Sequence, residues 1–222
     1  MVHTKTSHHD RMEVFLEKYR EPLPKPLEEL ERKALSEDVP IIRSGTRDML
    51  RFLLRERKPK EVLEIGTAVG FSAILMAEYD PVGCEIITIE NYEKRIPIAR
   101  ENFIRAEKEE QITLLEGDAK DVLETLTEPF DLIFMDAAKG QYLNFLPRVL
   151  ELLQPEGILI SDNVLQDGDI IESRFAVTRR NRTIHKRMRE YLYTLTHSEE
   201  LTTAVLPVGD GITISTKKGR KA

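Results

Sequence analysis

The order of apolar and polar residues divides the chain into a helical first part and an alternating second part. In the first part, apolar residues recur at helical spacing in three segments, near Phe15, over 27–36 and over 44–57. The prolines between 21 and 26 separate the first two segments, because the residue before a proline disfavours helical backbone. We therefore expect a helical N-terminal cap over 1–58 and a core over 59–222, which together form a single domain.

Beyond this cap, short apolar runs alternate with amphipathic segments. The apolar runs predict five strands, over 61–65, 85–90, 112–117, 131–136 and 157–162. The segments between them predict four helices, over 71–79, 91–108, 118–126 and 141–153. This alternation is typical of βαβ units, and it indicates a doubly wound parallel sheet with helices on both faces.

The end of the chain departs from this alternation. A charged helix is expected over 174–196, and two further apolar runs, 201–208 and 211–216, follow it. They are joined by Gly209-Asp210-Gly211, which is a tight-turn signal. The sequence therefore predicts an antiparallel strand pair at the end of a seven-stranded, Rossmann-like α/β sheet.

Composition narrows the class of protein. The 222 residues are 41% hydrophobic and carry a net charge of −6, which excludes a globally basic nucleic-acid binder. The single cysteine, Cys84, excludes a disulfide framework and a cysteine-based zinc site. No apolar run approaches the length of about 20 residues that a membrane-spanning helix needs, and the N-terminus lacks a signal segment. We expect a soluble, cytoplasmic protein without a membrane partner.

The first three strand ends carry residues suited to a nucleoside-like ligand, because doubly wound sheets bind ligands at the carboxyl ends of their strands. Gly66 and Gly70 allow a close approach of the backbone, although Ala68 breaks the dinucleotide fingerprint. Glu64 suits an amino-bearing ligand, and Glu90 can take both hydroxyls of a ribose. Asp118 either caps a helix or meets a nucleobase. Together they suggest a ligand with ribose, adenine and an amino acid portion but no phosphate, and S-adenosylmethionine fits.

The fourth and fifth predicted strands end in acidic residues. Asp136 ends one, and Asp162 followed by Asn163 ends the next, so we expect these side chains to lie within a few ångström of one another. Two carboxylates and an amide oxygen form a hard site that suits Mg²⁺, with Mn²⁺ or Ca²⁺ as alternatives. The other interpretation is that both aspartates only cap the loops that follow them.

As a set, these motifs resemble the Mg²⁺-dependent O-methyltransferases of the catechol and caffeoyl-CoA type. The segments that carry the resemblance are EIGTAVGFSA, TIENYEKR, EGDA, FMDAAKGQY and LISDNV. The resemblance implies the seven-stranded methyltransferase fold and a homodimer. The cofactor residues it implies are Ile42, Glu64, Gly66, Thr67, Ser72, Glu90, Ala119 and Asp136. It places the metal on Asp136, Asp162 and Asn163, and it gives Lys139, with Asp136, the catalytic role.

Within that family the chain is most similar to the bacterial tRNA 5-hydroxyuridine methyltransferases. The similarity lies in FMDAAKGQY and in the basic tract, residues 178–189, which holds six lysines or arginines and no acid. Such a tract favours binding to the phosphate backbone of a nucleic acid, although a run of charges more usually forms a solvated helix face. The candidate RNA-binding residues are Arg174, Arg179, Arg180 and Arg182. His185 is expected on the helix surface.

Two other functions remain open. The enzyme could methylate a small vicinal diol such as a catechol or a caffeoyl-CoA-like compound, and only the basic tract and the N-terminal helices separate this alternative from the first. The chain could also bind a cofactor without catalysis, which the presence of both carboxylates and Lys139 disfavours.

Overall fold

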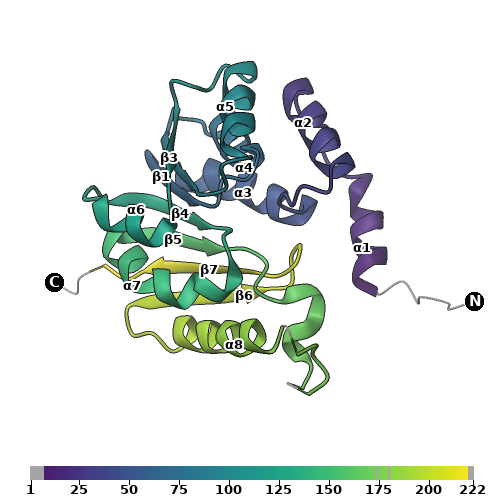
Figure 1. Cartoon of the computed structure of the whole chain (residues 1–222), viewed down its shortest axis with the longest axis vertical. Coiled ribbons are helices and arrows are strands. Elements are labelled where there is room, and N and C mark those ends of the chain that lie inside the picture. Colours follow the sequence, from purple (N-terminus) through teal and green to yellow (C-terminus); the bar gives the residue numbers. More distant parts are fainter. Residues whose placement is uncertain (1–7, 174, 180, 220–222) are drawn as a thin grey trace, which may run out of the picture.

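A seven-stranded sheet with the order β3-β2-β1-β4-β5-β7-β6 runs through the protein (Figure 1). The computed structural model describes residues 8–173, 175–179 and 181–219. The strands are β1 (Glu61–Ile65), β2 (Glu85–Glu90), β3 (Ile112–Glu116), β4 (Phe130–Met135), β5 (Leu153–Ser161), β6 (Leu201–Leu206) and β7 (Ile212–Lys217). The first five are parallel, whereas β7 is antiparallel to both β5 and β6. The predicted seven-stranded, Rossmann-like α/β sheet with an antiparallel strand pair at its end is confirmed.

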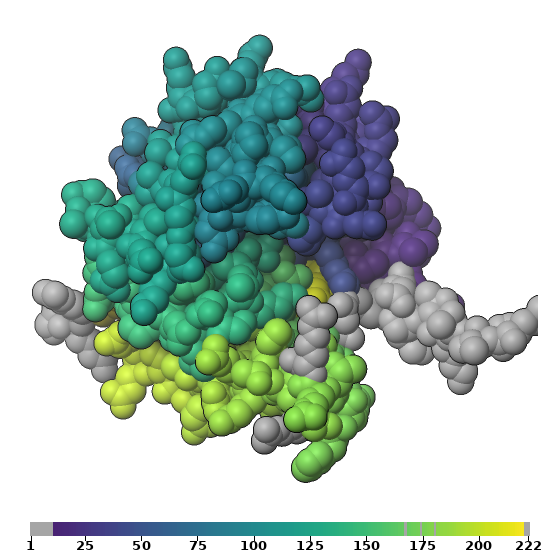
Figure 2. Space-filling view, in the orientation of Figure 1, coloured from purple at the N-terminus to yellow at the C-terminus, as the bar shows by residue number. Residues whose placement is uncertain are grey.

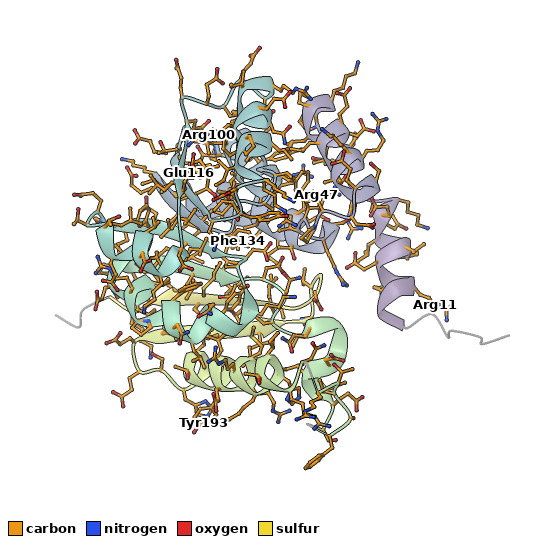
Figure 3. The ribbon with its side chains drawn as sticks, viewed as in Figure 1. Arg11, Arg47, Arg100, Glu116, Phe134 and Tyr193 are labelled. Carbon is orange, nitrogen blue, oxygen red and sulfur yellow. The ribbon has the colours of Figure 1, made fainter. Side chains whose placement is uncertain are left out.

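Helices cover both faces of this sheet. They are α1 (His8–Glu17), α2 (Lys25–Ser36), α3 (Ser44–Arg57), α4 (Phe71–Tyr79), α5 (Ile96–Arg105), α6 (Ala119–Thr125), α7 (Tyr142–Leu152) and α8 (Arg182–Thr196). Two short 3₁₀ turns, η1 (Lys139–Gln141) and η2 (Gln166–Ile171), follow β4 and β5. One apolar core joins α2 to α5 with the sheet, and a second joins α6, α7 and α8 with its other face. Phe134 of β4, labelled in Figure 3, is fully buried between these layers.

Three elements begin four or more residues away from their predicted starts. The helix expected from residue 91 begins only at Ile96, because the Glu90 carboxylate accepts the backbone N–H groups of Asn91 and Tyr92 and holds them in a turn. The helix expected from 174 begins at Arg182, because the preceding residues form turns that bury Val177. Strand β5 begins at residue 153, four residues early, with a register shift against β4.

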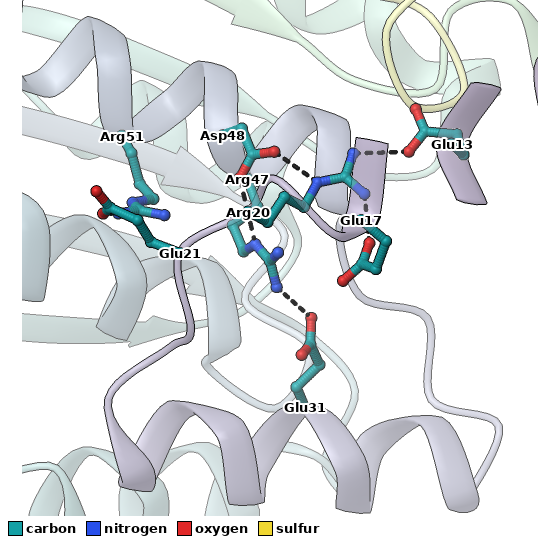
Figure 4. Close-up of polar contacts among 8 residues, drawn as sticks. All are labelled: Glu13, Glu17, Arg20, Glu21, Glu31, Arg47, Asp48 and Arg51. Atoms are coloured by element: carbon teal, nitrogen blue, oxygen red, sulfur yellow. Dashed lines mark hydrogen bonds and ion pairs between the residues drawn. The ribbon is translucent and has the colours of Figure 1, made fainter. Parts of the chain in front are cut away.

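Ion pairs tie the N-terminal helices to one another (Figure 4). Arg20, whose side chain is 7% exposed, bonds to carboxylates at Glu13, Glu17 and Asp48. Further pairs link α3 to the segments around it: Arg47 with Glu31 of α2, and Arg51 with Glu21. In Figure 2 these N-terminal helices form the purple and dark blue surface on one side of the molecule. They fix where α3 begins, and that position matters for the site described below.

In the described ranges, every helix is too short or too polar to cross a membrane.

Candidate active site

A cavity of about 720 Å³ opens at the carboxyl ends of the parallel strands. It brings together most of the residues predicted from the sequence: Ile42, Gly66, Thr67, Ser72, Glu90, Ala119, Asp136, Lys139 and Asn163. Glu64 and Asp162 are not among the lining residues, and both are buried directly behind the cavity wall. The cavity therefore has two ends, one formed by the loops after β1, β2 and β3 and the other by the loops after β4 and β5.

The loop after β1 passes very close to the end of β4. Gly66 has a φ of +105°, and a Cβ atom there would lie 2.1 Å from the carbonyl oxygen of Asp136. Only glycine has both the conformational freedom and the space for this position. The sequence suggested that Gly66 lets a ligand approach the backbone. The structure shows that glycine is also needed there because the ends of β1 and β4 lie so close together.

Both carboxylate oxygens of Glu64 accept a hydrogen bond within the protein. Ser72 Oγ donates to one oxygen and Thr88 Oγ1 to the other, each at 2.5 Å, and Thr67 hydrogen-bonds Thr88 in turn. Burial raises the pKa of Glu64 to about 7, against the two hydroxyl hydrogen bonds that lower it. Glu64 therefore holds Ser72 and Thr88 in place from behind the cavity wall, and its role toward an amino-bearing ligand stays a prediction.

Glu90 lines the cavity at the end of β2. Its carboxylate accepts the backbone N–H groups of Ala68, Asn91 and Tyr92 at 2.8–3.0 Å, which fixes its orientation. A carboxylate has about four acceptor positions, so hydroxyl groups of a ligand can still be accommodated. Asp118 is the N-cap of α6, where it accepts the N–H of Lys120, and it also lines the cavity, so both interpretations offered for it remain compatible with the structure.

At the other end of the cavity, the ends of β4 and β5 lie side by side. Met135 pairs with Ser161, and the N–H of Asp162 donates to the Met135 carbonyl. The hydroxyl of Tyr142 lies within 3.1 Å of the carbonyls of Met135 and Asp162 and joins the two strand ends. This arrangement brings Asp136 next to Asp162, as adjacent parallel strands require.

The two aspartates are short of positive partners. Asp162 Oδ1 accepts from Thr46 Oγ1 and from the N–H of Asn163, but Asp162 Oδ2 is buried and has no hydrogen-bond partner in the part of the chain that the structure describes. Burial and the neighbouring carboxylates raise the pKa of both Asp136 and Asp162. An unpaired buried carboxylate oxygen is costly, and a divalent cation would supply the missing partner. The two carboxylates and the amide of Asn163 offer the hard oxygen atoms that Mg²⁺ prefers.

Lys139 stands at the rim beside these acids. Its ammonium lies 3.8 Å from Asp210 Oδ2, and its side chain is about one-third exposed, at 32%. Asp210 also accepts from Asn163 Nδ2 at 3.4 Å. Lys139 therefore lies beside the carboxylates of Asp136, Asp162 and Asp210, with about a third of its side chain exposed to solvent.

The basic tract is partly built into the structure. Three of its arginines donate to backbone carbonyls: Arg182 to Val177, Arg187 to Gly140 and Arg189 to Ile170. Arg179 is exposed, whereas Arg174 and Arg180 lie outside the described residues. The expectation of a surface position for His185 is wrong, because the residue is 4% exposed and its Nε2 lies 3.1 Å from the carbonyl of Glu172.

Sequence reasoning missed several residues of the site. Arg95, Gln141 and Phe145 line the cavity, and Thr46 and Asp210 contact the acidic cluster. Thr46 is 116 residues from its partner Asp162, so no local pattern connects them. A signal existed only for Asp210, which is the central residue of the Gly-Asp-Gly turn.

Comparisons with known proteins point to one family. A family model described as O-methyltransferase matches residues 18–218. The chain is 35% identical over 127 residues to a catechol O-methyltransferase of Niastella koreensis, a match that spans 55% of this chain and 58% of that enzyme. It is 30% identical to caffeoyl-CoA O-methyltransferase 1 of Eucalyptus globulus over 86% of this chain and 81% of that enzyme. The crystal structure of the Podospora anserina methyltransferase PaMTH1 with bound SAH superposes with a TM-score of 0.87, at 28% identity and 99% coverage of both chains.

Proposed function

Because the chain belongs to the O-methyltransferase family, we propose that it methylates the 5-hydroxyl of 5-hydroxyuridine in tRNA with the help of Mg²⁺. The chain is an S-adenosylmethionine-dependent O-methyltransferase. SAH, present in the Podospora structure, is what remains of this cofactor after its methyl group has left. The proposal concerns the substrate, the cation and the residues that serve them.

The cation would be held by Asp136, Asp162 and Asn163. The support for this assignment is the buried, unpartnered Oδ2 of Asp162 beside a second carboxylate. When bound, Mg²⁺ supplies a positive charge that favours the ionised form of a substrate hydroxyl and fixes two neighbouring substrate oxygens. The 5-hydroxyl and the 4-carbonyl of 5-hydroxyuridine are such a pair, and so are the two hydroxyls of a catechol.

The chain's own residues would then handle the proton and the orientation. Lys139 Nζ would accept the proton that the hydroxyl loses, provided that its own extra proton has first been released to solvent, which a cation bound nearby would favour. The hydroxyl oxygen forms a bond to the methyl carbon as the bond between carbon and sulfur breaks, leaving SAH. Glu90 and the Gly66 loop would orient the cofactor so that this displacement occurs in line. Positioning and charge, rather than covalent participation by the protein, would provide the catalysis.

One observation carries the choice of an RNA substrate. The basic tract is bonded to the rim of the cavity, because Arg187 Nη1 donates to the carbonyl of Gly140 at 2.7 Å. Gly140 stands between Lys139 and Gln141, both of which line the cavity. In a protein of net charge −6, this contact supports a basic surface near the reaction site, to which a phosphate backbone would be attracted.

A small vicinal diol is the second candidate. It is favoured by the relatives named above, which are a catechol and a caffeoyl-CoA O-methyltransferase. Both candidates use the same acidic cluster and the same lysine, so they differ in what the basic tract and the N-terminal helices contribute.

The test offers methyl-labelled S-adenosylmethionine and Mg²⁺ with two substrates in parallel, tRNA that contains 5-hydroxyuridine and caffeic acid. We expect label in the tRNA and its loss with EDTA. Arg179→Glu should raise the KM for tRNA about tenfold and reduce its salt dependence, because a phosphate contact is lost. The matched control is Arg105→Glu on α5, a side chain that is 63% exposed and far along the chain from the tract. Label in caffeic acid alone would contradict the RNA proposal and leave the small-diol candidate.

A further inference from the structure

The turn between β6 and β7 brings a carboxylate into the back of the acidic cluster. Asp210 Oδ2 accepts from Asn163 Nδ2 at 3.4 Å and lies 3.8 Å from Lys139 Nζ. Its side chain is only 4% exposed, and its charge contributes to the raised pKa of Asp162. Asp210 therefore contacts both a proposed cation-binding residue and the proposed base.

The two glycines beside Asp210 explain how it reaches this position. Gly211 has a φ of +81°, and a Cβ atom there would lie 2.2 Å from Leu165 Cγ. Gly209 has a φ of +60°, and its Cβ would lie 2.6 Å from Thr46 Oγ1. The backbone of the turn is also bonded to the loop after β5, since Leu165 N–H donates to the Asp210 carbonyl. Gly-Asp-Gly is thus more than a tight turn, because the missing side chains let it press against α3 and this loop.

Asp210 is not placed as a third carboxylate ligand. Across the described part of the chain, no three side chains from His, Cys, Asp and Glu are grouped so that they could hold a metal ion. Its effect must pass through the residues it contacts. An amide side chain has a donor end and an acceptor end, so the bond from Asn163 Nδ2 to Asp210 leaves Asn163 Oδ1 on the opposite side. That oxygen is the atom of Asn163 that a hard cation would require.

We propose that Asp210 is a positioning residue that fixes the amide of Asn163 with its oxygen available to the cation and holds Lys139 at the rim. This inference rests on the cation site of the proposed function. It assigns to the β6–β7 turn a role in cation binding that the ligand residues alone do not account for. Partners that orient metal ligands in this way contribute about 10- to 100-fold in metal affinity or activity.

The test measures Mn²⁺ binding directly by electron paramagnetic resonance, in the absence of any methyl acceptor. Asp210→Asn keeps the volume of the side chain but removes its charge, and we expect Mn²⁺ affinity to fall about tenfold. Binding of SAH, measured by calorimetry, should be unchanged, because Asp210 does not line the cofactor end of the cavity. At saturating Mn²⁺, kcat should remain reduced, because Lys139 has lost its partner as well.

A double-mutant cycle separates positioning from a general structural effect. In an Asn163→Ala background, Asp210→Asn should cause no further loss of Mn²⁺ affinity, since the residue through which it acts is gone. The charge control is Asp121→Asn, on the exposed surface of α6. Equal Mn²⁺ affinity in wild type and Asp210→Asn, or additive losses in the double variant, would overturn the inference while leaving the proposed function intact. A wild-type protein that binds no Mn²⁺ would instead refute the cation site itself and the inference with it.

Discussion

The two ends of the cavity treat buried acids in opposite ways. At the cofactor end, every carboxylate oxygen of Glu64 and Glu90 accepts at least one hydrogen bond from a hydroxyl or backbone N–H of the protein. At the acidic end, Asp136 and Asp162 lie beside each other, and Asp162 Oδ2 is buried with no hydrogen-bond partner among the described residues. The carboxylates of the first end bind the protein's own loops, whereas the second end leaves an oxygen that the proposed cation would contact.

This difference separates the carboxylates that hold the loops of the protein in place from those that leave an interaction unmade. Satisfied carboxylates orient loops and need nothing from solution, so the cofactor end can be formed in the free protein. Adjacent carboxylates repel: besides burial, Asp162 raises the pKa of Asp136, and Asp210 raises the pKa of Asp162. A site left in this condition at the rim of a cavity is a candidate for function rather than for stability.

The largest effect should come from removing the acidic end. Asp162→Ala, or excess EDTA with the wild-type protein, should reduce methyl transfer at least about a hundredfold, because the charge that fixes and activates the substrate oxygen is lost. Initial rates with labelled S-adenosylmethionine measure this. Glu116→Ala at the end of β3 is the control, since its carboxylate is 53% exposed and pairs only with Arg100 among the described contacts. Full activity of the EDTA-treated enzyme would sink the cation-dependent proposal.

A smaller effect is expected from Thr46, which links the N-terminal helices to the acidic end. Thr46→Val keeps the shape but removes the hydroxyl that donates to Asp162 Oδ1 at 3.1 Å, so Mn²⁺ affinity should fall about tenfold. Thr46→Ser should restore it, because the hydroxyl returns. Electron paramagnetic resonance of bound Mn²⁺ is the measurement. If Thr46→Val and Thr46→Ser bind Mn²⁺ equally weakly, the methyl packing rather than the hydrogen bond is what matters.

The cofactor end should respond to pH rather than to metal. The pKa of Glu64 is raised from 4.5 to about 7 in the folded protein, so the folded state holds a proton that the unfolded state releases. Its contribution to stability is therefore greatest below pH 4.5 and is lost as the pH rises through about 7. Glu64→Gln should gain stability relative to wild type between pH 5.5 and pH 8, as measured by urea denaturation with EDTA present. An identical pH dependence in both proteins would show that Glu64 stays ionised.

The sequence predicted which two aspartates lie together at the acidic end of the cavity, but it did not predict the residues that contact them from other elements. Asp136 and Asp162 could be paired in advance because parallel neighbours end at the same sheet edge, a rule that needs no tertiary detail. Thr46 and Asp210 could not, since their contacts depend on how α3 and the β6–β7 turn pack against β5. The start of α8 was misjudged for a similar reason. A run of charged residues does not reveal that Val177 becomes buried and that arginine side chains bond the loop before the helix.

The smallest effect should come from the ion pair between Arg100 and Glu116, both labelled in Figure 3, since neither residue lines the cavity. The two side chains are 50% and 53% exposed, and exposed pairs contribute about 0–1 kcal/mol to stability. Arg100→Ala should therefore change the free energy of unfolding by less than about 1 kcal/mol and leave methyl transfer unaltered.

The ion pair of Arg47, also labelled in Figure 3, gives the contrast, because the Arg47 side chain is only 5% exposed and pairs with Glu31. Its replacement by alanine would strand a half-buried carboxylate beside the start of α3, at a cost of about 3 kcal/mol. Urea denaturation of both variants tests this contrast, and equal losses would show that burial does not decide the strength of these pairs.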